Sequence, residues 1–137
     1  MYASLESTIN DVVYKIVKKG IFDNKGEIDN ILGVLSNNGV YAMWVYVKSK
    51  KKEANKEKNL GEEEKDLMKE LRPLFEKVFP DKFNGQNNND YENEYEKFFR
   101  EIAEDLPTLI FVKDILERTL TYIRYHVKAL DVKALED

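Results

Sequence analysis

The sequence contains no cysteine, one histidine, one tryptophan and three prolines among its 137 residues. Without cysteine the chain can form neither a disulfide nor a thiolate metal site, and a single histidine excludes a pair of histidine ligands. The lack of cysteine fits a reducing compartment. The longest apolar run, residues 40–47, is far shorter than the roughly 20 residues that a membrane-spanning helix needs. No basic and apolar leader follows Met1. These features predict a soluble cytoplasmic protein.

Motifs for catalysis and for metal binding are also missing. His126 is the only candidate for a histidine base, and no serine lies in a Gly-x-Ser-x-Gly motif. The asparagine-rich stretch 84–90 contains a single carboxylate, Asp90, whereas a calcium loop needs several alternating acidic ligands. We find no phosphate-binding loop and no dinucleotide fingerprint. The sequence therefore predicts a protein that is not an enzyme, with no cofactor, no metal ion and no small-molecule substrate.

Apolar residues recur at helical spacing along most of the chain, and strand-like alternation and internal repeats are absent from the sequence. The pattern predicts one all-α domain over residues 1–137, a bundle of about five helices in which the second and the last are long and central. Exposed polar segments are expected near 53–61 and 80–90. The five helices are predicted over 5–19, 28–52, 62–78 (with a kink or break at Pro73), 91–104 and 107–130.

The long second helix is predicted from a stretch that contains NILGVLSNNGVYAMWVYVKSKKK. Its apolar residues keep the helical period through Asn38 and Gly39, so we interpret it as one helix with Gly39 on the buried stripe. The alternative is a break at Asn38-Gly39, because Asn-Gly favours a turn and glycine costs about 1 kcal/mol inside a helix. In a continuous helix, the side opposite the buried stripe carries Tyr41, Trp44, Lys48, Lys51 and Lys52.

The net charge of −4 argues against a generic nucleic-acid-binding protein, which would be basic. The charges are unevenly distributed, however. Residues 48–58 contain six lysines and two glutamates, whereas residues 90–105 contain seven acidic residues and two basic ones. Such a polarised molecule could contact a phosphate backbone with one end and a basic protein with the other.

Two surfaces are candidates for nucleic-acid binding. The first combines Tyr41 and Trp44 with the lysines at the end of the second helix, because stacking rings and phosphate-neutralising cations occur together in single-stranded nucleic-acid sites. Composition alone favours the alternative in which both rings are buried. The second surface is a polar stripe on the last helix, where cations could hold a backbone without reading its sequence, formed by Lys113, Glu117, Arg124 and Lys128.

A second apolar face on the last helix lies nearly opposite its main one and contains Phe111, Ile115, Tyr122 and Tyr125. Burial on both sides implies either a place at the centre of the bundle or a contact with another protein chain. Arg118 lies among these aromatic residues. We therefore assign Arg118, Tyr122 and Tyr125 to a protein interface.

The stretch VLSNNGVYAMWVYVKSK resembles the signature of the small α-helical subunit of the Cmr complex, the type III-B CRISPR–Cas effector. The motif of that family has the form NGLxxTLAFxxxK. Residues 38–40 match its opening, Tyr46 stands at the aromatic position and Lys50 at the closing lysine. The departures are Met43 in place of threonine and Trp44 in place of an aliphatic residue.

The last predicted helix adds to this resemblance. Its sequence DILERTLTYIRYHVKAL is similar to the closing helix of the family, in which an aromatic residue is followed by basic ones. Tyr122 and Arg124 match that pattern, whereas Tyr125 replaces a basic residue. The small subunit of the type III-A complex, Csm, shares much of the same pattern and remains an alternative.

The resemblance implies a non-catalytic structural subunit of an RNA-guided ribonucleoprotein that serves antiviral defence. Such subunits stack in several copies along the effector filament and contact the backbone of guide RNA paired with target RNA, while another subunit cleaves the target. The implied partners are the other effector subunits, copies of the same chain, guide RNA and target RNA. The residues that this resemblance leads us to assign to RNA backbone contact are Lys48, Lys50, Lys51, Lys52, Arg124 and Lys128.

Two other classes of function remain open from the residues alone. One is a helical protein-interaction adaptor or homodimeric regulator that binds no nucleic acid. The other is a small helical enzyme that uses carboxylates in the interior of its bundle. Salt-dependent RNA binding separates both from the RNA-contacting subunit.

Overall fold

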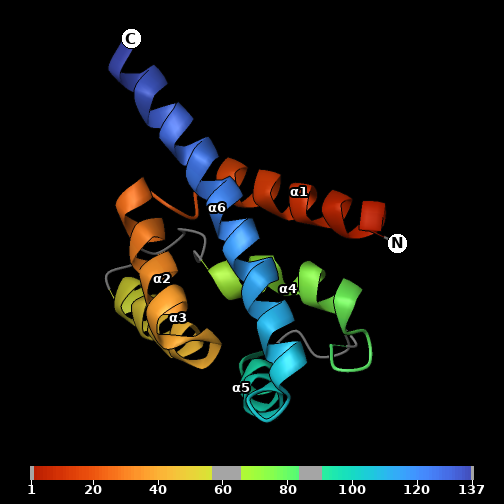
Figure 1. The fold of residues 1–137 in the computed structure, drawn as a ribbon. Coiled ribbons are helices and arrows are strands. Elements are labelled where there is room, and N and C mark those ends of the chain that lie inside the picture. The colour runs from red at the N-terminus through yellow and green to blue at the C-terminus, as the bar shows by residue number, and fades with distance from the viewer. Residues whose placement is uncertain (1, 57–65, 84–90, 137) are drawn as a thin grey trace.

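The computed structural model describes the backbone of residues 2–56, 66–83 and 91–136, and the side chains within 5–51, 66–83 and 91–130. Over these residues the chain forms six helices and no strand, which confirms the all-α prediction (Figure 1). Of the expected polar segments, 57–61 and 84–90 lie outside the described residues. The helices are α1 (Tyr2–Lys19), α2 (Lys25–Asn38), α3 (Val40–Lys56), α4 (Leu67–Val78), α5 (Tyr91–Ile102) and α6 (Leu106–Glu136).

The count of about five helices is wrong because the predicted helix over 28–52 is two helices separated by Gly39. Gly39 has φ 97° and ψ −178°, a backbone conformation that is essentially restricted to glycine. Its N–H donates to the carbonyl of Leu35 and its carbonyl accepts from the N–H of Met43, each at 3.1 Å. Gly39 alone therefore separates the end of α2 from the start of α3. The turn preference of Asn-Gly prevails over the continuous apolar period.

The break changes which side of α3 faces the core. The buried residues of α3 follow helical spacing and are Val40, Met43, Trp44 and Val47. A continuous helix would place Trp44 on the outer side, whereas its side chain is 1 % exposed. Its ring lies 5.5 Å from that of Tyr95 and 6.0 Å from that of Phe99, both on α5. Burial is therefore confirmed for Trp44, but Tyr41 remains 38 % exposed.

Helix α4 is one element that continues through Pro73, so of the two outcomes expected there, a kink or a break, the break is absent. It begins at Leu67, later than predicted, because Asp66 has an extended backbone and caps the helix. The Asp66 carboxylate accepts a hydrogen bond from the N–H of Lys69 at 3.3 Å. Residues 62–65, where the predicted helix begins, lie outside the described residues.

The last helix is longer than predicted and packs against several other helices. Its first turn is capped by Asp105, whose carboxylate accepts from the hydroxyl of Thr108 at 2.7 Å and from its N–H at 3.5 Å. From there α6 continues for 31 residues and packs against α1, α2, α3 and α5. Figure 1 shows its final turns extending past the rest of the molecule.

Helices α4 and α5 are joined by aromatic rings and by one buried arginine. Phe75 of α4 lies edge-on to Tyr95, Phe98 and Phe99 of α5, with ring centroids 5.3 to 6.0 Å apart. Arg72 is 6 % exposed, and its guanidinium donates to both carboxylate oxygens of Glu94, at 3.0 and 3.2 Å. A buried cation needs such partners, because an unpaired charge in the interior is costly.

We expect Gly39→Ala to lower the free energy of unfolding by about 1–3 kcal/mol, because alanine does not adopt this φ and ψ without strain. Gly33→Ala is the matched control: Gly33 lies inside α2 with nothing within 4 Å of an added Cβ, and should be neutral or stabilising. Urea unfolding followed by circular dichroism measures both. A more stable Gly39→Ala variant would contradict the break.

Candidate nucleic-acid interface

Two of the lysines assigned to RNA lie at the surface of α3 beside aromatic rings. The ammonium of Lys48 lies 5.6 Å from the ring centroid of Trp44, and that of Lys50 lies 5.6 Å from the ring centroid of Tyr46. Lys50 is exposed and Lys48 is partly exposed. Because the break at Gly39 directs the Trp44 side chain into the core, Lys48, one turn later on α3, lies at the edge of that core.

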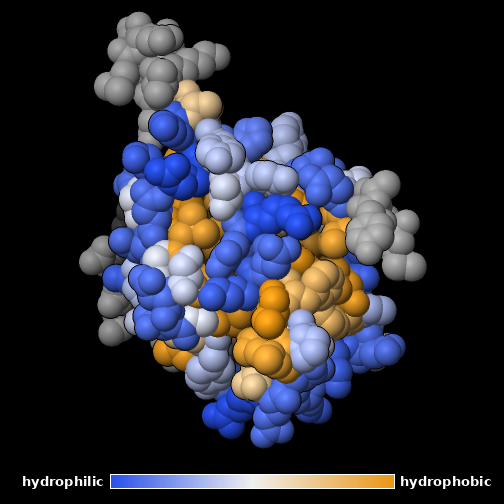
Figure 2. Space-filling view, viewed as in Figure 1, coloured by the Kyte–Doolittle hydropathy of each residue, from blue (hydrophilic) through white to orange (hydrophobic). Residues whose placement is uncertain are grey.

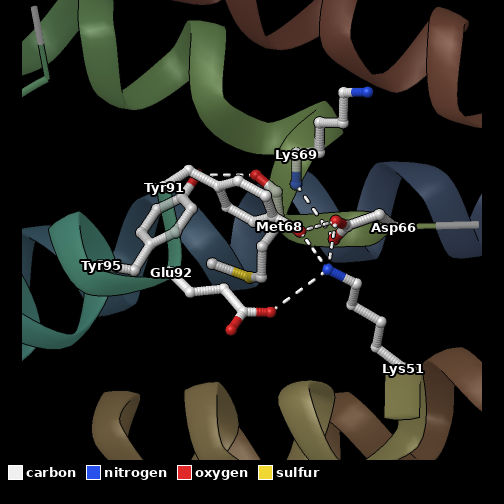
Figure 3. A network of polar contacts seen from close by, with 7 residues as sticks. All are labelled: Lys51, Asp66, Met68, Lys69, Tyr91, Glu92 and Tyr95. Carbon is white, nitrogen blue, oxygen red and sulfur yellow. Dashed lines mark hydrogen bonds and ion pairs between the residues drawn. The ribbon is translucent and has the colours of Figure 1, made fainter. Parts of the chain in front are cut away.

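Lys51 occupies a different environment, shown in Figure 3. Its ammonium forms ion pairs with Asp66 at 3.1 Å and with Glu92 at 3.2 Å, and its side chain is only 16 % exposed. It also donates to the hydroxyl of Tyr91 and lies 4.9 Å from the centroid of that ring. Lys51 thus joins α3 to the residue that caps α4 and to the first turn of α5. An RNA phosphate would have to displace these partners in order to reach it.

Asp66 is the centre of this network and is itself 4 % exposed. Besides the ion pair with Lys51, its carboxylate accepts from the hydroxyl of Tyr91 and from the N–H of Lys69. Close by, the hydroxyl of Tyr95 donates to the carbonyl of Met68 at 2.7 Å (Figure 3). The buried carboxylate therefore has partners from three helices, as a buried charge requires.

The remaining lysine of this group, Lys52, belongs to α3, but its side chain lies outside the described residues.

The cations predicted on the last helix lie on α6, and two of them, Lys113 and Arg124, form ion pairs within the chain, Lys113 with Glu117 at 4.0 Å. The Nε atom of Arg124 lies 2.5 Å from a carboxylate oxygen of Asp29 on α2, and the Arg124 side chain is 29 % exposed. Lys128 is exposed and has no ion pair among the described residues. Lys113 of the same stripe donates to the carbonyl of Ser36 at 3.4 Å. Arg124 and Lys113 therefore both connect α6 to α2.

Two of the three residues assigned to a protein interface have partners within the chain. Arg118 and Tyr122 both reach Glu6 of α1, at 3.8 Å from the guanidinium and 3.5 Å from the hydroxyl. Tyr125 is 61 % exposed, and Phe111 on the same face is 42 % exposed. The second apolar face of α6 is thus covered by α1 at its middle and is open at Phe111 and Tyr125.

Glu96 of α5 is a central polar residue that the sequence did not reveal. Its carboxylate accepts from the hydroxyl of Tyr41 at 2.6 Å, from the indole N–H of Trp44 at 3.0 Å and from Nε of Arg100 at 2.7 Å. These donors, the Tyr41 hydroxyl first, lower the pKa of Glu96 from 4.5 to about 2. The four-residue spacing of Glu96 and Arg100 on one helix indicates that they pair. The contacts of Glu96 with Tyr41 and Trp44 have no such signal in the sequence, because they depend on the break at Gly39.

The described part of the chain shows no cluster of three or more residues suited to bind a metal ion. No helix within it is both long enough and apolar enough to cross a membrane.

No family model, no curated protein and no solved structure matches the chain. The resemblance to a CRISPR effector subunit therefore depends on residues 38–50 and 114–130 themselves, and on where the structure places them.

We expect Lys51→Met to lower the free energy of unfolding by roughly 3 kcal/mol, because it leaves the buried Asp66 without its cation. Lys48→Met is the matched control on the same helix. Its ammonium has only the Trp44 ring as a described contact, so its loss should cost less than about 1 kcal/mol. Chemical unfolding of both variants makes the comparison. Equal costs would show that the network does not hold α3, α4 and α5 together.

The pKa of Glu96 predicts a pH dependence of stability. Since folding lowers this pKa from 4.5 to about 2, the stabilising contribution is complete above about pH 5 and is lost as the pH falls toward 2. We expect wild type to exceed Glu96→Gln in unfolding free energy by about 1–3 kcal/mol at pH 7, and the difference to vanish near pH 2. Glu104→Gln, at an exposed site outside these contacts, is the control. A difference that does not change with pH would contradict the assignment.

Proposed function

We propose that the chain is a non-catalytic structural small subunit of a type III-B CRISPR RNA-guided effector complex, active in antiviral defence. In this proposal it contacts the backbone of guide and target RNA without reading sequence, beside the other effector subunits and copies of itself. Catalysis belongs to another subunit of the complex. The small subunit of a type III-A complex would perform the same role.

The observation that supports this proposal best is the way the family-like motif maps onto α3. Val40 and Trp44, at two aliphatic positions of the motif, are buried, as is Met43 at the threonine position, whereas Val45 at the alanine position is 46 % exposed. Tyr46, at the aromatic position, packs against the core, and Lys50, at the closing lysine, is exposed over the Tyr46 ring. A motif with this distribution combines residues that form the fold with a lysine exposed at the surface.

The cations best placed for RNA are Lys48 and Lys50 on α3 and Lys128 on α6, because their ammonium groups lie at the surface. Arg124 adds a guanidinium that is partly exposed but shared with Asp29. Lys51 is a weaker candidate, because three side chains of the network already hold its ammonium. So few contacts imply weak binding by one copy, which several copies along one RNA would strengthen.

An adaptor that binds protein and no nucleic acid is the second candidate, and exposed apolar surface supports it. Leu106 and Ile110 are 64 % and 59 % exposed in the first turns of α6. Contiguous apolar side chains at a surface are typical of protein–protein contacts. An effector subunit also needs such contacts, so RNA binding must separate the two functions.

We expect the purified chain to bind single-stranded and duplex RNA of unrelated sequences with similar affinity, and with affinity that falls as salt rises. Replacing Lys48, Lys50 and Lys128 together by alanine should reduce the salt slope by about 2, since each lost phosphate contact removes roughly 0.7–0.9. Fluorescence anisotropy over a salt series measures this.

The matched control replaces Lys15, Lys18 and Lys77, three exposed lysines on α1 and α4, and makes the same change in net charge. It should leave the slope unchanged. An equal decrease of the salt slope in both variants would show that RNA binding depends on net charge alone and not on Lys48, Lys50 and Lys128. Binding that does not depend on salt, or no binding to RNA at any salt concentration, would favour the adaptor.

A further inference from the structure

The first turns of α6 carry large apolar side chains at the surface. Leu106 and Ile110 are 64 % and 59 % exposed, and Phe111 is 42 % exposed. These three residues form the apolar patch. Figure 2 shows hydrophobic side chains at the surface on this side of the molecule. Apolar side chains that are exposed next to one another gain free energy when a partner covers them, so such patches are typical of protein–protein contacts.

The apolar patch has the form of a helix ridge. Leu106 and Ile110 are four residues apart and therefore lie one above the other on α6, with Phe111 beside Ile110. The ring of Phe111 lies 6.4 Å from that of Phe79, the residue that follows α4. Side chains four residues apart form ridges that pack between the side chains of a second helix. A partner helix laid across the first turns of α6 therefore fits this surface.

The apolar patch lies in a part of the chain with an excess of negative charge. Residues 79–82 and 101–118, which contain the patch and its neighbours, include six acidic residues and three basic ones. Each basic residue forms an ion pair with an acidic one of the same set: Lys82 with Glu101 at 3.1 Å, Lys113 with Glu117 at 4.0 Å and Arg118 with Asp114 at 3.1 Å. The carboxylates of this set that form no ion pair with a described residue are those of Asp81, Glu104 and Asp105.

These three carboxylates lie beside the apolar patch, and all three residues are exposed. Glu104 and Asp105 belong to the connection between α5 and α6 that leads directly into Leu106. The ion pair of Lys82 holds the segment after α4 beside this connection, and the same segment contains Asp81. The patch is therefore bordered by negative charge that no cation of the described chain neutralises through an ion pair.

This charge distinguishes between possible occupants of the apolar patch. A nucleic acid would be repelled, because its phosphates carry charge of the same sign. Two copies that faced each other through this surface would bring their unpaired carboxylates together, which is also unfavourable. Lysine or arginine side chains of a partner would be attracted instead, provided that they flank apolar residues able to cover the patch.

We propose that the apolar patch is the docking surface for a basic amphipathic helix of a different protein. The apolar side of that helix packs along the ridge of Leu106 and Ile110, and its cations lie against Asp81, Glu104 and Asp105. This inference goes beyond the proposed function, because it names a protein partner by its chemistry and does not depend on RNA binding.

Binding of synthetic peptides to the full chain tests the proposal. The probe is a peptide of about 14 residues, or about four helical turns, with leucine on one side and lysine on the other. We expect it to bind wild type, and to bind Leu106→Ser and Ile110→Ser at least about tenfold more weakly. A peptide with glutamate in place of every lysine should also bind wild type at least about tenfold more weakly. Fluorescence anisotropy of labelled peptides measures the affinities, and circular dichroism verifies that the variants fold.

Two control variants on α1 match the changes in the patch. Tyr14→Ser removes an apolar side chain that is 63 % exposed, and should leave binding of the lysine peptide unchanged. Glu104→Lys should weaken binding of this peptide. Asp11→Lys, at an exposed position, makes the same change in net charge and should have little effect.

A lysine peptide that does not bind wild type, or a glutamate peptide that binds equally well, overturns the proposal. So do equal losses in the patch variants and in their controls. Self-association of wild type that Ile110→Ser abolishes would assign the patch to a second copy and overturn it too. RNA binding is measured on the same preparations. Peptide binding without RNA binding would refute the proposed function alone, and RNA binding without peptide binding would refute this inference alone.

Discussion

The backbone conformation of Gly39 is the constraint on which the arrangement of α3 depends. Ending α2 and restarting the helix one residue later rotates α3 so that Trp44, which a continuous helix would place on the outer side, lies in the core beside Val40 and Met43. The same rotation brings the indole N–H of Trp44 to the carboxylate of Glu96. Two hydrogen bonds and one permissive backbone angle therefore determine how a helix of 17 residues is placed. The side chains of α3 that an external partner could reach are those that this rotation leaves exposed.

The polar network around Asp66 is a second consequence of the rotation. Lys51 lies two turns after Trp44, on the side of α3 that now faces α4 and α5, so its ammonium meets Asp66 and Glu92 instead of water. The end of α3 and the starts of α4 and α5 lie next to segments outside the described residues. The structural role of Lys51 and the binding role proposed for Lys48 and Lys50 belong to positions only a few residues apart, because a helix turns successive side chains to different neighbours.

Much of the fold could be predicted from the sequence, because long apolar stripes identify helices without reference to the rest of the chain. The predicted stripes of α1, α4, α5 and α6 match the observed helices to within a few residues at most ends. At Gly39 two signals conflicted, and the apolar period continued by coincidence across the break. The contacts of Lys51, Arg124 and Glu96 could not be predicted, because each depends on residues 15 to 95 positions away being brought together by packing. The exposure of Phe111 and Tyr125 likewise depends on how far α1 covers α6, which no local pattern determines.

The angles at Gly39 also limit what can occupy that position during evolution. A φ of 97° with ψ near 180° is the mirror image of the extended backbone that ordinary residues adopt readily. A residue of D configuration would therefore fit there without strain, but none is available to the ribosome. Glycine, which has no handedness, is the only encoded residue that meets the requirement, and every amino-acid replacement at this codon adds a Cβ on the unfavourable side. The position of α3 relative to the core thus depends on the achirality of a single residue.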